Sequence, residues 1–140
     1  MLYIHDVERI IKDTLLELNL NVNYEINNHL AVPMSFNVSS STIKFNYLHV
    51  NGFLGRVRIK ETKENLVKIL VYHILGYYLD YKMNKYDLRT LMYGEDEEID
   101  QLKTQIETNS WDYGRTLVPD ELVDAYDQVR DFEKIHIPHY

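Results

Sequence analysis

The stretch Glu61–Lys82, ETKENLVKILVYHILGYYLDYK, decides the fold of this chain. Nearly every position in its second half is apolar or aromatic, and the polar exceptions before Asp80 are His73 and Gly76. A helix that is apolar nearly all round is a buried one, so we expect a central helix here. Glycine in mid-helix costs about 1 kcal/mol relative to alanine, which predicts a close backbone approach at Gly76. One helix face carries Leu66, Leu70, His73, Tyr77 and Tyr81.

The segment His73–Tyr77, HILGY, has the spacing of the zinc-protease helix motif HExxH. That motif places two histidines one turn apart so that both bind one metal ion, and its glutamate takes a proton from water. Here Ile74 stands in place of the glutamate and Tyr77 in place of the second histidine. Isoleucine cannot accept a proton, and a neutral phenol with a pKa of about 10 is a poor zinc ligand.

Composition limits the class of protein. The 140 residues suit a single domain over residues 1–140, and a net charge of −7 disfavours binding to nucleic acid or anionic lipid. The absence of cysteine excludes disulfides and thiolate metal sites. The first residues do not resemble a signal peptide, and the apolar run at 66–79 is too short to span a membrane. We therefore expect a cytoplasmic protein.

An amphipathic helix is predicted over residues 3–19, followed by three short strands. Asparagine and serine turns separate the strands, and short turns favour antiparallel hairpins. Pro33 lies inside the second strand, which makes that strand an edge or a bulged one. Residues 49–60 contain two glycines, so we expect a loop that ends in a short extended segment. The strands are Val22–Ile26, Ala31–Asn37 and Thr42–Leu48, and the extended segment is Arg56–Lys60.

Three more helices are predicted after the central one. Residues 85–93 suit a short helix. A second helix begins in the acidic run Glu95–Asp100, where carboxylates suit a helix N-terminus, and continues to about Tyr113. A last amphipathic helix covers residues 120–134, and a loose tail follows over residues 135–140.

Three segments of the chain resemble the ImmA/IrrE family of metallopeptidases. VYHILGYYLDY is similar to the family's central helix xxHELGHYLxx, and STIKFN to the strand that carries an Ile-x-Ile-Asn pattern. ETNSWDYGRTLVPDEL is similar to the later helix that supplies the third metal ligand. The resemblance covers about residues 3–130. It implies an α+β, zincin-like fold with an N-terminal helix, a small antiparallel three-stranded sheet, a buried central helix and C-terminal helices.

By this resemblance, His73 matches the first metal ligand, Tyr77 stands at the second, and Ile74 stands at the general base. The third ligand position falls on Glu107 or on Thr108, depending on which end of the later helix sets the register. The resemblance thus implies the remnant of a metal site at His73, Tyr77 and Glu107, with no metal and no other cofactor. A hydrogen bond between His73 and Glu107 would keep such a site polar without a metal.

We predict on this basis a catalytically inactive protein, not an enzyme, that binds or regulates another cytosolic protein. Family members commonly occur on phages and mobile elements beside repressors that they inactivate, so the resemblance implies a transcriptional repressor as a natural partner. The partner would bind between the strand Thr42–Leu48 and the central helix. The basic cluster of Arg56, Arg58 and Lys60 is either a further partner contact or a solvated edge.

Two alternatives stay open. In the first, the chain is a metal-dependent peptidase with an atypical zinc site, formed by His73, Glu107 and a third group such as Asp80. In the second, it is a structural subunit of a phage or of a larger complex.

Overall fold

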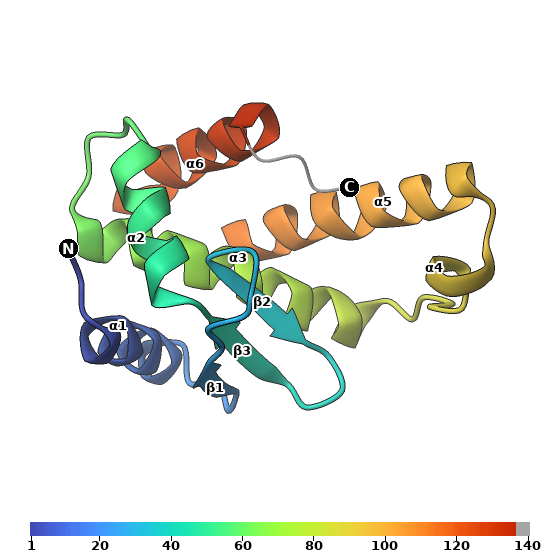
Figure 1. The fold of residues 1–140 in the computed structure, drawn as a ribbon, viewed down its shortest axis with the longest axis horizontal. Coiled ribbons are helices and arrows are strands. Elements are labelled where there is room, and N and C mark those ends of the chain that lie inside the picture. Colours follow the sequence, from blue (N-terminus) through green and yellow to red (C-terminus); the bar gives the residue numbers. More distant parts are fainter. Residues whose placement is uncertain (137–140) are drawn as a thin grey trace.

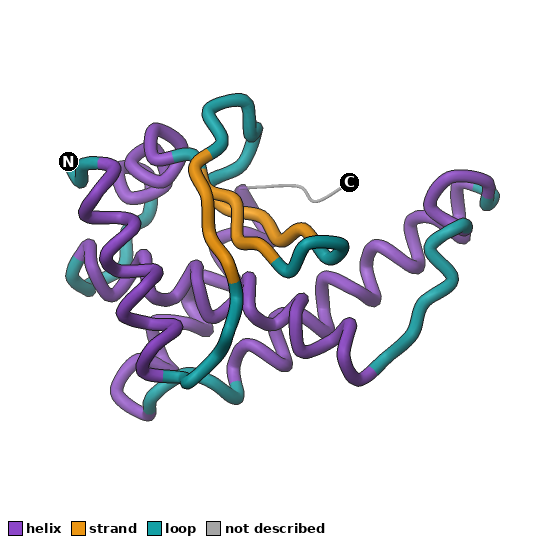
Figure 2. Tube along the Cα trace, turned by 90° about the horizontal axis from the view of Figure 1, so that it is seen from below, coloured by secondary structure: helices purple, strands orange, loops and turns teal. Residues whose placement is uncertain are grey.

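The computed structural model describes residues 1–136, which form six α-helices, one 3₁₀ helix and a three-stranded sheet (Figure 1). The predicted α+β class is confirmed. In both Figure 1 and Figure 2, α4 and the adjoining part of α5 extend away from the body of the molecule. In chain order the elements are α1 (Ile4–Glu17), β1 (Asn23–Ile26), β2 (Met34–Asn37), β3 (Thr42–Phe45), α2 (Tyr47–Arg56), α3 (Lys63–Met83), α4 (Thr90–Tyr93), α5 (Asp96–Arg115), η1 (Asp120–Leu122) and α6 (Val123–His136).

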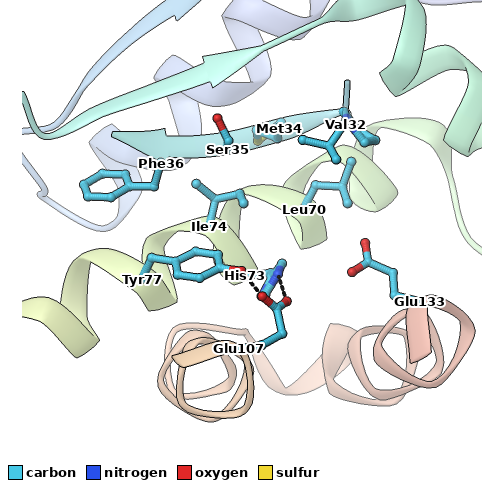
Figure 3. Close-up of a pocket in the computed structure, with 11 residues that line it drawn as sticks. Val32, Met34, Ser35, Phe36, Leu70, His73, Ile74, Tyr77, Glu107 and Glu133 are labelled. Carbon is cyan, nitrogen blue, oxygen red and sulfur yellow. Dashed lines mark hydrogen bonds and ion pairs between the residues drawn. The ribbon is translucent and has the colours of Figure 1, made fainter. Parts of the chain in front are cut away.

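Helix α3 forms the buried centre of the molecule, as predicted. Eleven of its residues are buried, and they lie on every side of the helix. Thr62 caps its N-terminus, because the Thr62 side chain accepts a hydrogen bond of 3.1 Å from the backbone N–H of Asn65. The sheet covers one side of α3, while α5 and α6 lie on the other (Figure 3). Over residues 1–136, every helix is too short or too polar to cross a bilayer.

The sheet is mixed, with the strand order β1-β3-β2, so the prediction of a purely antiparallel sheet is wrong. Strand β2 pairs antiparallel with β3, whereas β1 pairs parallel with it. The chain leaves β1 without forming a hairpin and returns as β2 on the far side of β3. The turn after β2 reverses the chain, so β3 runs in the same direction as β1 and pairs with it in parallel. Strand β2 is an edge strand, as expected from the neighbouring Pro33.

Helix α2 replaces the loop that was predicted over residues 49–60. Asn46 starts this helix, because its side chain accepts a hydrogen bond of 3.1 Å from the backbone N–H of Leu48. Val50 and Phe53, three residues apart, are fully buried and hold one helix face against the core. The capping residue and this spacing outweigh the low helix propensity of the two glycines in α2. No strand forms over 56–60.

Helices α3 and α5 cross with their backbones in contact at two glycines. A Cβ atom at Gly76 would lie 1.7 Å from the carbonyl oxygen of Ser110 on α5. A Cβ atom at Gly114 would lie 2.5 Å from the carbonyl oxygen of Tyr72 on α3. The close approach predicted at Gly76 is therefore confirmed, and its partner is α5. This crossing also places Ser110 beside His73.

The remaining helices follow the predicted order with shifted ends. Helix α4 is only four residues long, and α5 begins with a capping box between Glu95 and Glu98. Ile106 and Trp111 of α5 are buried, whereas Ile99 and Leu102 are partly exposed. Helix α6 runs to His136, past the expected start of a loose tail, and the rest of that tail lies outside the described residues. The single domain over residues 1–140 stays a prediction.

Candidate metal-binding site

A pocket of about 230 Å³ lies where β2, α3, α5 and α6 meet (Figure 3). Strand β2 and the side of α3 that faces it contribute apolar side chains, which we call the apolar wall: Val32, Pro33, Met34, Phe36, Leu70 and Ile74. The opposite side carries ionisable and hydroxyl groups, which we call the polar floor: His73, Tyr77, Glu107 and Glu133. Helix α3 thus contributes to both sides of the pocket, with apolar side chains on one side and polar side chains on the other.

His73 lies at the centre of the polar floor. Its Nε2 atom is 3.1 Å from Oε1 of Glu107, the distance of an ion pair, so the two residues meet as expected, while the hydrogen bond between them stays a prediction. The imidazole is buried and stacks on the indole of Trp111, with 3.7 Å between the ring centres. Thr108 is exposed and outside the pocket, so Glu107 is the residue that α5 brings to the site.

Ser110 contacts the Nδ1 nitrogen of His73. The Ser110 hydroxyl donates its single hydrogen to the backbone carbonyl of Glu107, at 2.8 Å. Its oxygen lies 3.4 Å from His73 Nδ1 and can therefore only accept a hydrogen from that nitrogen. A hydrogen on Nδ1 would thus be accepted by Ser110, and Nε2 faces the carboxylate of Glu107. An imidazole held in this way presents Nε2 as a metal ligand.

Tyr77 acts on the other side of Glu107. Its hydroxyl donates a hydrogen bond to Oε2 of that carboxylate. Burial, together with the negative charge of Glu107, raises the pKa of Tyr77 far above its ordinary value. The phenol therefore keeps its proton and holds the carboxylate in place, which fits the expectation that Tyr77 is a poor metal ligand.

Glu133 completes the group, and sequence reasoning missed it. It comes from α6 and is only 7% exposed. Among the side chains that the structure describes, those of residues 1–133, none forms a hydrogen bond or an ion pair with its carboxylate, and Figure 3 shows it pointing into the pocket. Burial, and then the charge of Glu107, raise its pKa to about 8. One ligand atom from each of His73, Glu107 and Glu133 lies within 4.8 Å of the other two.

A signal for Glu133 was present in the sequence. It follows Tyr126 and Val129 on the buried stripe of α6, where the spacing of seven and four residues predicts an inward side chain. A carboxylate on an apolar stripe becomes buried and then needs a hydrogen-bond donor or a cation as its partner. Such a residue is therefore a candidate for a binding site.

A solved structure is similar to this chain. It is the crystal structure of the metallopeptidase zymogen of Methanocaldococcus jannaschii jannalysin, with a TM-score of 0.39 and 20% sequence identity. The match covers 73% of this chain and 94% of that chain. No family model matches the sequence, and no curated protein does.

The prediction that the chain is not an enzyme is corrected here. It was based on the loss of the motif's glutamate and second histidine, and it took no account of Glu133. The structure brings three side chains that can ligate a metal into one pocket. Because such a group could hold a catalytic metal ion, it points toward an enzyme rather than a protein without catalytic activity.

Asp80, suggested as the third ligand, belongs to a different network. It is fully buried and accepts hydrogen bonds of 2.8 and 2.9 Å from the hydroxyl of Tyr86. The side-chain amides of Asn84 and Asn109 donate to it at 2.9 and 3.3 Å. Its oxygens are therefore occupied, and it ties the end of α3 to α5 outside the polar floor.

Replacing Asp80 by alanine is expected to lower the free energy of unfolding by about 2–4 kcal/mol, because several partly buried donors lose their acceptor. Urea unfolding followed by circular dichroism measures the change. Asp87→Ala is the matched control, since Asp87 is exposed and pairs only with the exposed Arg89. A loss at position 80 no larger than at position 87 would show that the network contributes little.

The other residues and the strand predicted for the site do not belong to the polar floor. Ile74 belongs to the apolar wall and is 4% exposed. The strand that lines the pocket is β2, not the predicted Thr42–Leu48, because β3 is the central strand of the sheet. Arg56, Arg58 and Lys60 are exposed and do not line the pocket, so their role as partner contacts stays a prediction.

Proposed function

We propose that this chain is a metal-dependent peptidase whose centre is formed by His73, Glu107 and Glu133. The observation that carries the proposal is the convergence of these three side chains, from three different helices, in one pocket. None of the three is near another in the sequence, so local structure does not explain why they meet.

The residues fit a divalent cation. An imidazole nitrogen and two carboxylates are ligands that zinc and similar cations accept, and three protein ligands is the number found in catalytic zinc sites. Glu133 supplies the independent test, because its carboxyl group is 93% buried and has no hydrogen-bond partner among the side chains of residues 1–133, so its ionised form is costly unless a cation neutralises it. When bound, the cation would supply Lewis-acid chemistry for hydrolysis.

The neighbouring edge strand supports a polypeptide as the substrate. Strand β2 pairs with β3 along one side only, and it lines the pocket beside the polar floor. The free side of such a strand offers backbone N–H and C=O groups to an extended chain. A polypeptide lying along β2 would pass directly over His73 and Glu133.

The remaining residues assist without taking part in proton transfer. Ser110 orients His73, and Tyr77 holds Glu107. Ile74 stands where a general base is expected and cannot accept a proton. General bases of this kind contribute about 10²–10⁴-fold to the rate, so we expect slow turnover by this chain.

We further propose membership of the ImmA/IrrE family, supported by the segment around His73 and Gly76 and by the helix that carries Glu107. The resemblance would make the substrate a transcriptional repressor or another cytosolic protein, in the cytoplasm of a host that carries a phage or mobile element. The structural-subunit alternative has no specific observation in its favour.

Metal binding is the first test. Protein stripped with a chelator and titrated with Zn²⁺ or Mn²⁺ by calorimetry is expected to bind one ion per chain. His73→Ala and Glu107→Gln are each expected to weaken binding roughly 100-fold or more. His49→Ala is the control, because His49 is exposed and lies outside the pocket. Slow cleavage of fluorescent casein should require the metal and disappear in the His73→Ala variant.

Two results would count against the proposal. One is the absence of stoichiometric binding by either ion to the wild-type protein. The other is casein cleavage that continues in both the His73→Ala and Glu107→Gln variants, which would indicate a contaminating protease.

A further inference from the structure

The apolar wall has no part in holding a metal. Figure 3 shows Leu70 and Ile74 pointing toward β2, whereas His73 and Tyr77 point toward Glu107. Ile74 and Leu70 are 4% and 3% exposed, and Met34 opposite them is 5% exposed. These side chains line the pocket of about 230 Å³, and Val32, which also lines it, is 38% exposed. The wall is therefore the apolar boundary of this pocket.

We propose that the apolar wall is a subsite for one aliphatic side chain of the polypeptide substrate, with Ile74 as the residue that determines this preference. The inference depends on the proposed function only in taking a polypeptide as the ligand. It gives Ile74 a role in recognition, at the position where the related motif has its catalytic glutamate.

The size of the pocket agrees with this ligand. An engineered apolar cavity of roughly 150 Å³ binds benzene, so a pocket of about 230 Å³ accommodates the side chain of leucine or methionine. Ile74, Leu70 and Met34 offer branched and flexible aliphatic surface without a polar group on these side chains. Burial of matching apolar surface is the main source of affinity in such a pocket.

The polar floor also affects which side chains the pocket binds. The carboxylate of Glu107 repels an acidic side chain that enters the pocket. A lysine is the real competitor, because its ammonium group could pair with Glu133. To do so it must place its charge beside the apolar wall, at a desolvation cost that an aliphatic side chain avoids. We therefore expect leucine and methionine to bind better than lysine, and lysine better than aspartate.

The test uses the full chain without metal, so failure of the metal site does not affect it. Isotope-labelled protein is titrated by NMR with the blocked amino acids N-acetyl-leucine, N-acetyl-lysine, N-acetyl-aspartate and N-acetyl-alanine methylamides. The leucine compound should shift the signals of Leu70 and Ile74 at millimolar concentration, and the alanine compound should bind roughly tenfold more weakly.

Two variants examine the wall itself. Ile74→Ala and Met34→Ala should each weaken binding of the leucine compound at least about fivefold, since each removes apolar contact surface. Two positions are used because one of these variants can fail to fold. Leu16→Ala is the matched control, as Leu16 is 68% exposed on α1 and lies outside the pocket.

The possible outcomes separate this inference from the proposed function. Leucine-selective shifts that depend on Ile74 or Met34 support it, whether or not a metal binds. Equal or stronger binding of the lysine or aspartate compound overturns it, as does the absence of saturable shifts in the pocket. Metal binding by the Ile74→Ala variant should match the wild type, because Ile74 is not a ligand.

Discussion

Replacing Gly76 by alanine is expected to destabilise the protein by more than about 4 kcal/mol and to leave much of it unfolded. The added Cβ would lie 1.7 Å from the carbonyl oxygen of Ser110 and 2.9 Å from the backbone nitrogen of Gly114. Both neighbours are backbone atoms of α5, so no side-chain rotation relieves the overlap. The two helices would have to separate along their whole contact.

Circular dichroism and thermal unfolding measure this effect. The matched control is Gly55→Ala, because Gly55 is exposed in α2 and a Cβ there meets nothing within 4 Å. Alanine favours helix by about 1 kcal/mol over glycine, so the control should be as stable as the wild type or more stable. A Gly76→Ala variant with the unfolding temperature of the wild type would show that α3 and α5 do not approach as closely as described.

The same contact is a condition for the candidate site. Ser110 and Glu107 lie one turn apart on α5 and reach His73 because α5 packs backbone against backbone on α3. A variant with a separated crossing would lose the hydrogen bond to His73 Nδ1. We therefore expect any Gly76→Ala protein that folds to bind metal weakly.

Replacing Glu133 by glutamine is expected to stabilise the metal-free protein while weakening metal binding about 100-fold or more. In the folded protein burial raises the pKa of Glu133 to about 8, well above the value of about 4.3 in an unfolded chain. Ionising this carboxylate therefore opposes folding. A glutamine has nearly the same shape and carries no charge, so it avoids that cost.

The pH dependence has a definite sign. Because the pKa of Glu133 is higher in the folded state, the stability of the wild type should fall as pH rises from about 4 to about 8, by at most about 1.4 kcal/mol per pH unit. The Glu133→Gln variant lacks this contribution and should be more stable by on the order of 5 kcal/mol at pH 8. Thermal unfolding of both metal-free proteins at pH 5 and pH 8 measures the difference.

Metal should reverse the order of stability. A cation bound at a thousand times its dissociation constant stabilises the folded state by about 4 kcal/mol, and only the wild type should show this gain. Glu97→Gln is the control, because Glu97 is exposed in the first turn of α5. If Glu133→Gln lowered the stability of the metal-free protein, the carboxylate of Glu133 would have a stabilising hydrogen bond or ion pair in the folded state, and the prediction would be wrong.

Local sequence patterns predicted several features correctly. The apolar stretch around Leu70 and Ile74 gave the buried helix, because a helix without a polar face has no stable exposed arrangement. Gly76 was correctly taken as the point of a close backbone approach. The pairing of His73 with Glu107 was also expected, since each lies in a segment that resembles a ligand-bearing helix.

Other features depended on contacts that no local pattern contains. Strand β1 is parallel to β3 because β2 lies on the far side of β3, and turn residues do not record on which side a strand returns. Helix α2 had a local signal in Asn46 and in the spacing of Val50 and Phe53. Its two glycines have low helix propensity, however, and they led to the prediction of a loop.

The amino-acid sequence by itself determined the central helix, the amphipathic helices around it and the loss of the motif's base at Ile74. These follow from side-chain periodicity and residue chemistry, which act over a few residues. Only the tertiary structure decided that Glu133, 60 residues from His73, faces the same pocket. The reason is physical: a carboxylate's pKa and its ability to hold a cation depend on burial and neighbouring charge, and both arise when α6 packs beside α3 and α5.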